Sequence, residues 1–114
     1  TNPEHYAVAL RYDAARMRAP IVVAKGIDRI AQRIRDIARD TGVPLVAAPP
    51  LARALYRHVD LGQEIPVALY AAVAQVLTYL LQVRLARRTG AAPPPLPDIS
   101  LDVEQPARAP EGRA

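Results

Sequence analysis

An asparagine followed by a proline, near the start of the chain, is the clearest place in this sequence for backbone chemistry. The side-chain amide nitrogen of Asn2 can attack the carbonyl carbon of the same residue, which breaks the peptide bond to Pro3 and leaves a succinimide. The competing attack by the next backbone nitrogen is blocked, because proline has no N–H. Cyclisation in an open chain is slow, so a fold must hold the nitrogen over the carbonyl and polarise it. His5 is a candidate donor or proton carrier, although Asn-Pro is also an ordinary turn opener.

Other kinds of catalytic chemistry find little support in the composition. The 114-residue chain has no cysteine, which excludes disulfides, thiolate nucleophiles and sulfur-ligated metals. His5 and His58 are too far apart in sequence to suggest a metal site, and His58 is better explained as a cap at a helix end. Lys25 is best explained as the solvated end of a strand. We therefore expect no cofactor and, at most, one self-cleavage event rather than enzymatic turnover.

Three segments have strand patterns and predict a small sheet. Residues 6–12 alternate large and small side chains, which indicates a strand with one closely packed face. The continuous apolar run after Pro20 predicts a strand that is covered on both faces and ends at Gly26. Residues 43–48 predict a further short buried strand. Because a helix separates the last two strands, we expect a right-handed crossover and one parallel strand pair.

Three helices are predicted around this sheet. The clearest begins with Asp28 as its N-terminal cap and is closed by Gly42. A short helix over residues 49–59 begins with two prolines. A last helix over residues 67–88 has an apolar side and arginines at its C-terminal end, where cations suit the helix dipole. The core-facing residues expected from the first helix are Ile27, Ile30, Ile34, Ile37 and Ala38.

The composition divides the chain into one domain and a tail. Residues 1–88 contain all of the predicted elements, whereas residues 89–114 are rich in proline, alanine and charge and predict a flexible or polyproline-like segment outside the core. We expect no stretch to approach the roughly 18 uncharged apolar residues that span a bilayer, and therefore we expect a soluble chain. The predicted fold class is α/β, a small sheet surrounded by α-helices with a disordered Pro-rich tail.

The charge balance leaves a small basic nucleic-acid adaptor as one open interpretation. The net charge is +4 and the isoelectric point is near 10.0. However, the predicted helix that carries most of the clustered arginine also carries Asp28, Asp36 and Asp40, and mixed signs on a helix are typical of a solvated face. The arginines concerned are Arg29, Arg33, Arg35 and Arg39.

Several blocks resemble the cytosolic domain of bacterial type III export switch proteins, the FlhB and YscU family. They are TNPEHYAVALRYD, APIVVAKG, VPLVAAPPLARALYRHVDLGQEIP and LYAAVAQVLTYL, and they cover about residues 1–85. The resemblance implies a four-stranded sheet surrounded by helices, attached to a multi-helix membrane domain at the cytoplasmic face of the inner membrane. It implies a part in flagellum biogenesis and type III secretion, in which autocleavage lets the apparatus switch substrate specificity. The implied partners are rod, hook, needle and filament substrates, other export-gate proteins and a length-control protein, with no nucleic acid.

The resemblance also assigns roles to individual residues. Asn2 would cyclise, Pro3 would be the leaving side and His5 would assist. Glu4 stands where the family usually has threonine, and its carboxylate could act as a base or only change the rate. The family's apolar patch for early export substrates would fall on Ala19, Pro20, Ala74 and Leu77.

Two interpretations of the whole chain stay open within this resemblance. The family has another strand just upstream of the asparagine, so we expect this sequence to be a fragment in which the first strand of the sheet is missing. The alternative is a stand-alone scaffold of the export gate that never cleaves. The blocks are closer to the flagellar than to the injectisome version.

Overall fold

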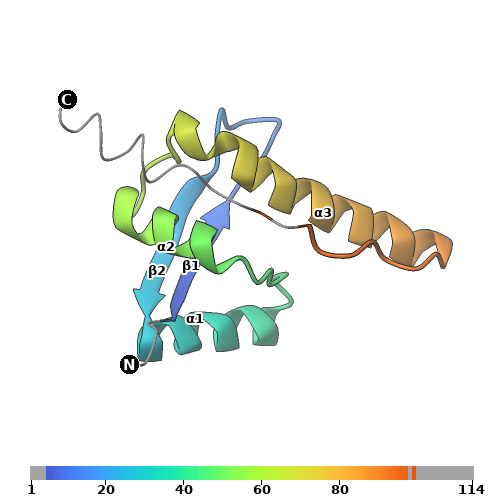
Figure 1. The fold of residues 1–114 in the computed structure, drawn as a ribbon, viewed down its shortest axis with the longest axis horizontal. Coiled ribbons are helices and arrows are strands. Elements are labelled where there is room, and N and C mark those ends of the chain that lie inside the picture. Colours follow the sequence, from blue (N-terminus) through green and yellow to red (C-terminus); the bar gives the residue numbers. More distant parts are fainter. Residues whose placement is uncertain (1–4, 98, 100–114) are drawn as a thin grey trace.

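The described residues form two strands and three α-helices (Figure 1). The computed structural model describes residues 5–97 and residue 99, so the predictions on Asn2, Pro3, Glu4 and most of the tail lie outside it. The α/β class predicted from the sequence is confirmed. In chain order the elements are β1 (Tyr6–Arg11), β2 (Ile21–Ile27), α1 (Asp28–Thr41), α2 (Pro49–His58), a 3₁₀ turn η1 (Val67–Leu69) and α3 (Tyr70–Thr89).

The two strands pair antiparallel, and a bulge interrupts the ladder. Ala9 pairs with Ala24 but the next residue of β1 pairs with Val22, which leaves Val23 as an extra residue in β2. The bulge turns Val22 fully into the core and leaves Val23 50% exposed. The prediction that the apolar run of β2 is covered on both faces is therefore wrong, since that run contains a change of face.

The predicted strand at residues 43–48 does not form, and no parallel pair occurs among the described residues. Val43 and Leu45 are exposed, and the segment has no ladder partner in the described part of the chain to satisfy its backbone groups. The outer edge of β2 is met instead by the turn after α2, where the Ile65 amide donates to the Pro20 carbonyl over 2.9 Å.

One face of the sheet is built from small residues, as the alternation in β1 predicted. Ala7 and Gly26 are buried opposite each other, and α1 packs on this side through its own buried Ala31. A methyl group added at Gly26 would overlap the Ile30 side chain, whose Cβ would lie 2.7 Å away. The helix and sheet backbones therefore approach closely.

The prediction that the isoleucines of α1 form its core face is partly wrong. Ile30 is 61% exposed and Ile37 is 48% exposed, whereas Ala31 and Ala38 are buried. The physical reason is the close approach of the helix to the sheet. Alanines occupy the narrow interface, and the larger isoleucines are displaced to its side.

The opposite face of the sheet carries the main hydrophobic core. Val22 from β2 packs with residues of α2 and with the first part of α3, and Leu69 and Val73 are almost completely buried there. Ile99 also belongs to this core, because the chain after α3 turns back along the helix (Figure 1). The expectation that everything after residue 88 lies outside the core is wrong at this position. The buried members are Ala19, Val22, Leu51, Ala54, Leu55, Val59, Ile65, Leu69, Ala72, Val73 and Ile99.

The last helix extends well past the sheet (Figure 1). It matches the predicted span closely and ends at Gly90, whose φ of 75° closes the last turn. The most apolar 18-residue window within Val67–Thr89 has a mean hydropathy of 1.4, so this helix is long and apolar enough to cross a membrane by length and composition. The expectation that no such stretch exists is therefore wrong, because Arg84 and its neighbours are confined to one end.

Candidate functional site

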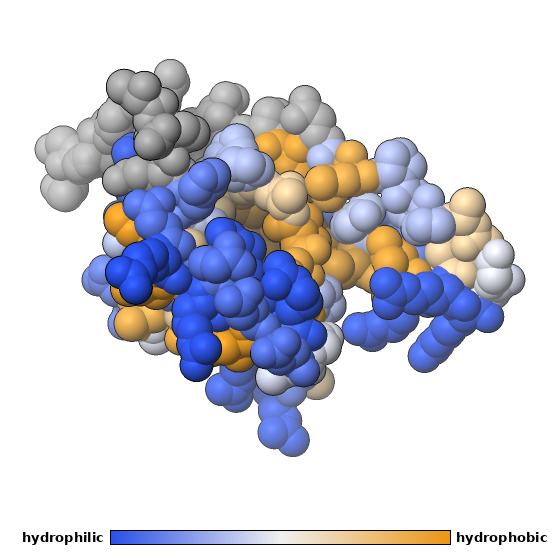
Figure 2. Space-filling model, turned by 90° about the horizontal axis from the view of Figure 1, so that it is seen from below, coloured by the Kyte–Doolittle hydropathy of each residue, from blue (hydrophilic) through white to orange (hydrophobic). Residues whose placement is uncertain are grey.

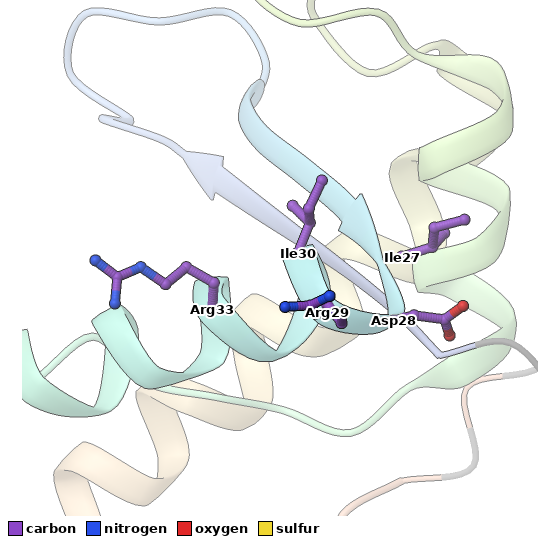
Figure 3. Close-up of a pocket in the computed structure, with 5 residues that line it drawn as sticks. All are labelled: Ile27, Asp28, Arg29, Ile30 and Arg33. Carbon is purple, nitrogen blue, oxygen red and sulfur yellow. The ribbon is translucent and has the colours of Figure 1, made fainter.

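The chain segment that follows the Asn-Pro dipeptide is tied to the junction between β2 and α1. The backbone amide of His5 donates to Asp28 Oδ1 over 3.1 Å, and the Asp28 amide donates to the His5 carbonyl over 2.8 Å. Figure 3 shows the Asp28 carboxylate pointing toward the start of β1, away from Arg29 and Arg33. This pair fixes the backbone three residues after Asn2, while the His5 side chain is exposed.

The junction itself has an unusual backbone. Asp28 has φ of 49°, the one positive value found at a non-glycine residue among the described residues. The prediction that Asp28 caps α1 is wrong, because the N-cap position is Ile27 and no side chain caps it. The Asp28 carboxylate binds the His5 amide instead. Aspartate is one of the few residues that tolerate a left-handed conformation, which accounts for its place at this turn.

A shallow depression lies beside the same junction, open to solvent (Figure 3). It is lined by Ile27, Asp28, Arg29, Ile30 and Arg33. Its arginines extend from α1 and give this side of the molecule a basic rim. The depression is too open to enclose a small molecule, since ligand sites bury most of the ligand surface.

A half-buried lysine joins β2 to the end of α2. Lys25 Nζ donates to the carbonyls of Tyr56 and Val59 over 3.0 and 2.8 Å, and it lies 5.1 Å from the centre of the Tyr56 ring. The Tyr6 ring lies 5.3 Å from the same tyrosine. Lys25 thus neutralises the C-terminal end of the α2 dipole and links it to the first residue of β1.

Both sequence interpretations for this region are corrected by these contacts. Lys25 is half-buried and is not a solvated strand end. It donates to carbonyls at the end of α2, where His58 was expected to act as the cap, and His58 is exposed. A signal for this role was present in the sequence. Lys25 lies on the same strand face as the large apolar residues, where a charge needs a partner.

The residues of the predicted substrate patch take two different positions. Ala19 is only 2% exposed and Pro20 is buried, so both are covered by the described chain. Ala74 is exposed on α3, and Leu77, one turn further, is half-buried against the core that contains Ala19. The expected shallow groove at Ala19 and Pro20 is therefore filled, whereas Ala74 and Leu77 present an accessible surface.

The arginines of α1 are engaged in part by their own helix. Arg39 lies 3.2 Å from Asp36 in an exposed ion pair, and Arg35 donates to the Gln32 side chain. These contacts favour a solvated face over a nucleic-acid surface.

Comparison with known proteins places this arrangement in a family. The FlhB HrpN YscU SpaS Family matches residues 1–80, a range that includes Asn2, Pro3 and His5. The chain is 56% identical over 98 residues to the flagellar biosynthetic protein FlhB of Salmonella typhimurium, with 86% of this chain and 26% of the relative covered. It is 45% identical over 84 residues to FlhB of Bacillus subtilis, covering 74% and 23% of the two chains.

Solved structures show the same likeness. The cytoplasmic domain of FlhB from Shewanella putrefaciens superposes with a TM-score of 0.77 at 47% identity, covering 87% of this chain and 80% of that one. The PscU C-terminal domain gives a TM-score of 0.66 at 41% identity, covering 68% and 99%. The chain belongs to the FlhB HrpN YscU SpaS family of flagellar and type III export components. It spans about a quarter of the length of the curated FlhB relatives it matches.

Proposed function

We propose that this chain is the cytosolic switch part of a type III protein export apparatus of the flagellar kind, and that it cleaves itself between Asn2 and Pro3. The observation that carries the proposal is the family match over residues 1–80, which contains the Asn-Pro dipeptide and His5. The tie between His5 and Asp28 supports it, because it gives the dipeptide a fixed downstream anchor.

The proposed reaction needs no cofactor and balances within two residues. The Asn2 side-chain nitrogen forms a bond to the Asn2 carbonyl carbon, and the bond from that carbon to the Pro3 nitrogen breaks. One proton of the side-chain amide passes to the Pro3 nitrogen, which becomes the new N-terminus. The products are a C-terminal succinimide and a chain that begins at Pro3, and water later opens the succinimide.

The anchored segment supplies two things to this reaction. Reciprocal hydrogen bonds at His5 reduce the freedom of the backbone that carries the leaving group, and such positioning lowers the entropic part of a barrier. The exposed His5 imidazole is the group assigned to carry the proton toward Pro3. Glu4 is the second candidate for proton transfer.

Substrate binding is proposed for the accessible part of the predicted patch. Ala74 and Leu77 share one face of α3 and lie at the rim of the main core, where an apolar segment of an early export substrate could pack. Ala19 and Pro20 would support this surface from below. We place the domain at the cytoplasmic face of the inner membrane, among the other export-gate proteins and a length-control protein.

Intact mass and N-terminal sequencing of the natural protein test the cleavage. A fragment that begins at Pro3 is expected from the wild-type protein and is expected to be absent from an Asn2→Ala variant. A Glu4→Thr variant separates the roles of the carboxylate: slower cleavage assigns Glu4 a part in catalysis, and faster cleavage assigns it a retarding charge. If the wild-type protein stays intact, the proposal fails and a non-cleaving scaffold is left.

A further inference from the structure

The outer half of α3 exposes large apolar side chains that the described chain does not cover. Leu81 is 52% exposed and Leu85 is 46% exposed, and they lie one turn apart on the face that turns away from the buried Ala72 and Val73. Only 17% of the most apolar part of Val67–Thr89 is buried. Figure 2 shows apolar side chains along this arm, with hydrophilic side chains near its far end. A helix that is apolar on an exposed side normally has a partner there.

The charge of the same region has one sign. The described stretch 67–97 contains no Asp or Glu, whereas Arg84, Arg87 and Arg88 lie together near the end of α3. None of the ion pairs found among the described residues includes these three arginines. On α1, by contrast, arginine and aspartate alternate. The end of α3 therefore combines exposed leucines with uncompensated positive charge.

We propose that the outer half of α3 lies on the surface of an anionic lipid bilayer. Leu81 and Leu85 enter the boundary between head groups and acyl chains, and the arginines bind lipid phosphates. Charge complementarity favours this occupant, because the exposed leucines lie beside arginines that have no acidic partner within residues 67–97. The inference goes beyond the proposed cleavage and does not depend on it.

The helix rests on the bilayer and does not cross it. Its first half is packed in the core through Ala72 and Val73. About 12 residues, or roughly 18 Å of helix, lie beyond this core, and Ala86 is the one buried residue among them. The hydrocarbon layer is about 30 Å thick, so the free part is too short to span it. A second copy of the chain is the competing occupant, but it would bring two arginine clusters with no acidic partner on α3.

Vesicle flotation with the full 114-residue chain tests the proposal. Vesicles of phosphatidylcholine alone are compared with vesicles that contain phosphatidylglycerol, at low and high salt. Binding is expected only to the anionic vesicles and is expected to fall with salt. Replacing Arg84, Arg87 and Arg88 by Gln should weaken binding on the order of 100-fold, because each basic residue near the surface contributes about fivefold. The matched control replaces Arg29, Arg33 and Arg39 of α1 by Gln and should bind almost as the wild type does.

A second variant pair tests the leucines. Leu81→Gln with Leu85→Gln should abolish flotation, whereas Ile30→Gln with Ile37→Gln, equally exposed on α1, should keep it. Far-UV circular dichroism and thermal unfolding check that each variant is folded. No flotation of the wild type, or equal loss with the α1 variants, would overturn the proposal. A concentration-dependent dimer that forms through Leu81 and Leu85 without lipid binding would assign the surface to a second copy and would also overturn it.

Discussion

The two faces of the β1–β2 sheet are packed in opposite ways. Under α1, Ala7, Gly26 and Ala31 bring helix and sheet close together, and the larger isoleucines are left at the side. On the other face, Val22 and Leu69 fill a deeper layer that α2 and α3 share. The α1 face therefore tolerates little added volume, whereas the α2 and α3 face tolerates little removed volume.

The largest effect is expected from removing volume in the deep layer. Leu69→Ala should lower the free energy of unfolding by about 3 kcal/mol, because Leu69 is fully buried and its cavity cannot collapse completely. Leu81→Ala on the exposed arm is the control and should change it by less than about 0.5 kcal/mol. Urea titration measures both values, and similar losses would mean that the exposed arm of α3 is packed as tightly as the deep layer.

Adding volume on the close face should have the next largest effect. Gly26→Ala should cost about 2 kcal/mol, because the new methyl group overlaps Ile30. Ile30→Ala alone should cost little, since Ile30 is mostly exposed. The double variant should recover about 1 kcal/mol relative to the sum of the two single changes, because the residues touch. If urea titrations show that the effects of Gly26→Ala and Ile30→Ala are strictly additive, this would contradict the close approach of α1 to the sheet.

A smaller effect is expected where the deep face meets the end of α2. Lys25→Met should lower the free energy of unfolding by about 1.5 kcal/mol, because two carbonyls lose a charged donor at the C-terminus of a helix. Arg57→Met removes an exposed cation from the same helix end and should stay within about 0.5 kcal/mol of wild type. Equal losses in the free energy of unfolding would mean that Lys25 acts only through its positive charge near the helix end and not through its two hydrogen bonds.

The smallest change is expected at the junction that joins the two faces. Asp28→Ala should cost about 1 kcal/mol, because it removes the acceptor for the His5 amide at a left-handed position. Asp28→Asn keeps an oxygen acceptor and tolerates the backbone, so it should stay close to wild type. Thermal unfolding measures the stability of each variant. The rate at which chains beginning at Pro3 appear measures how much the contact between His5 and Asp28 contributes to cleavage. If Asp28→Ala and Asp28→Asn have equal stabilities and equal cleavage rates, the Asp28 carboxylate does not anchor the segment at His5.

Local patterns predicted most of the elements. The alternation of residues 6–12 predicted the first strand and its small face, and Gly42 predicted the end of α1. The exposed isoleucines of α1 could not be predicted, because helical spacing says which residues share a side and not how closely that side approaches the sheet. The bulge at Val23 likewise depends on pairing with β1.

Long-range contacts account for the remaining differences. Residues 43–48 have strand composition, but a strand also needs a neighbour, and the described chain provides none. Ile99 lies in a proline-rich segment whose composition indicates flexibility, yet it packs in the core once the chain turns back along α3. At the site, the sequence and its family resemblance predict roles for Asn2 and His5, and these roles stay predictions. The Asp28 anchor was missed, because it joins residues 23 positions apart.

We propose that the fold, and not the dipeptide alone, makes the bond between Asn2 and Pro3 labile. The most direct test is the cleavage rate of uncleaved protein, recovered in denaturant and followed by intact mass after dilution into native buffer or into the same denaturant. Chains beginning at Pro3 are expected in the native sample and almost none in the denatured sample. Equal rates in both, or an intact native sample, would contradict it.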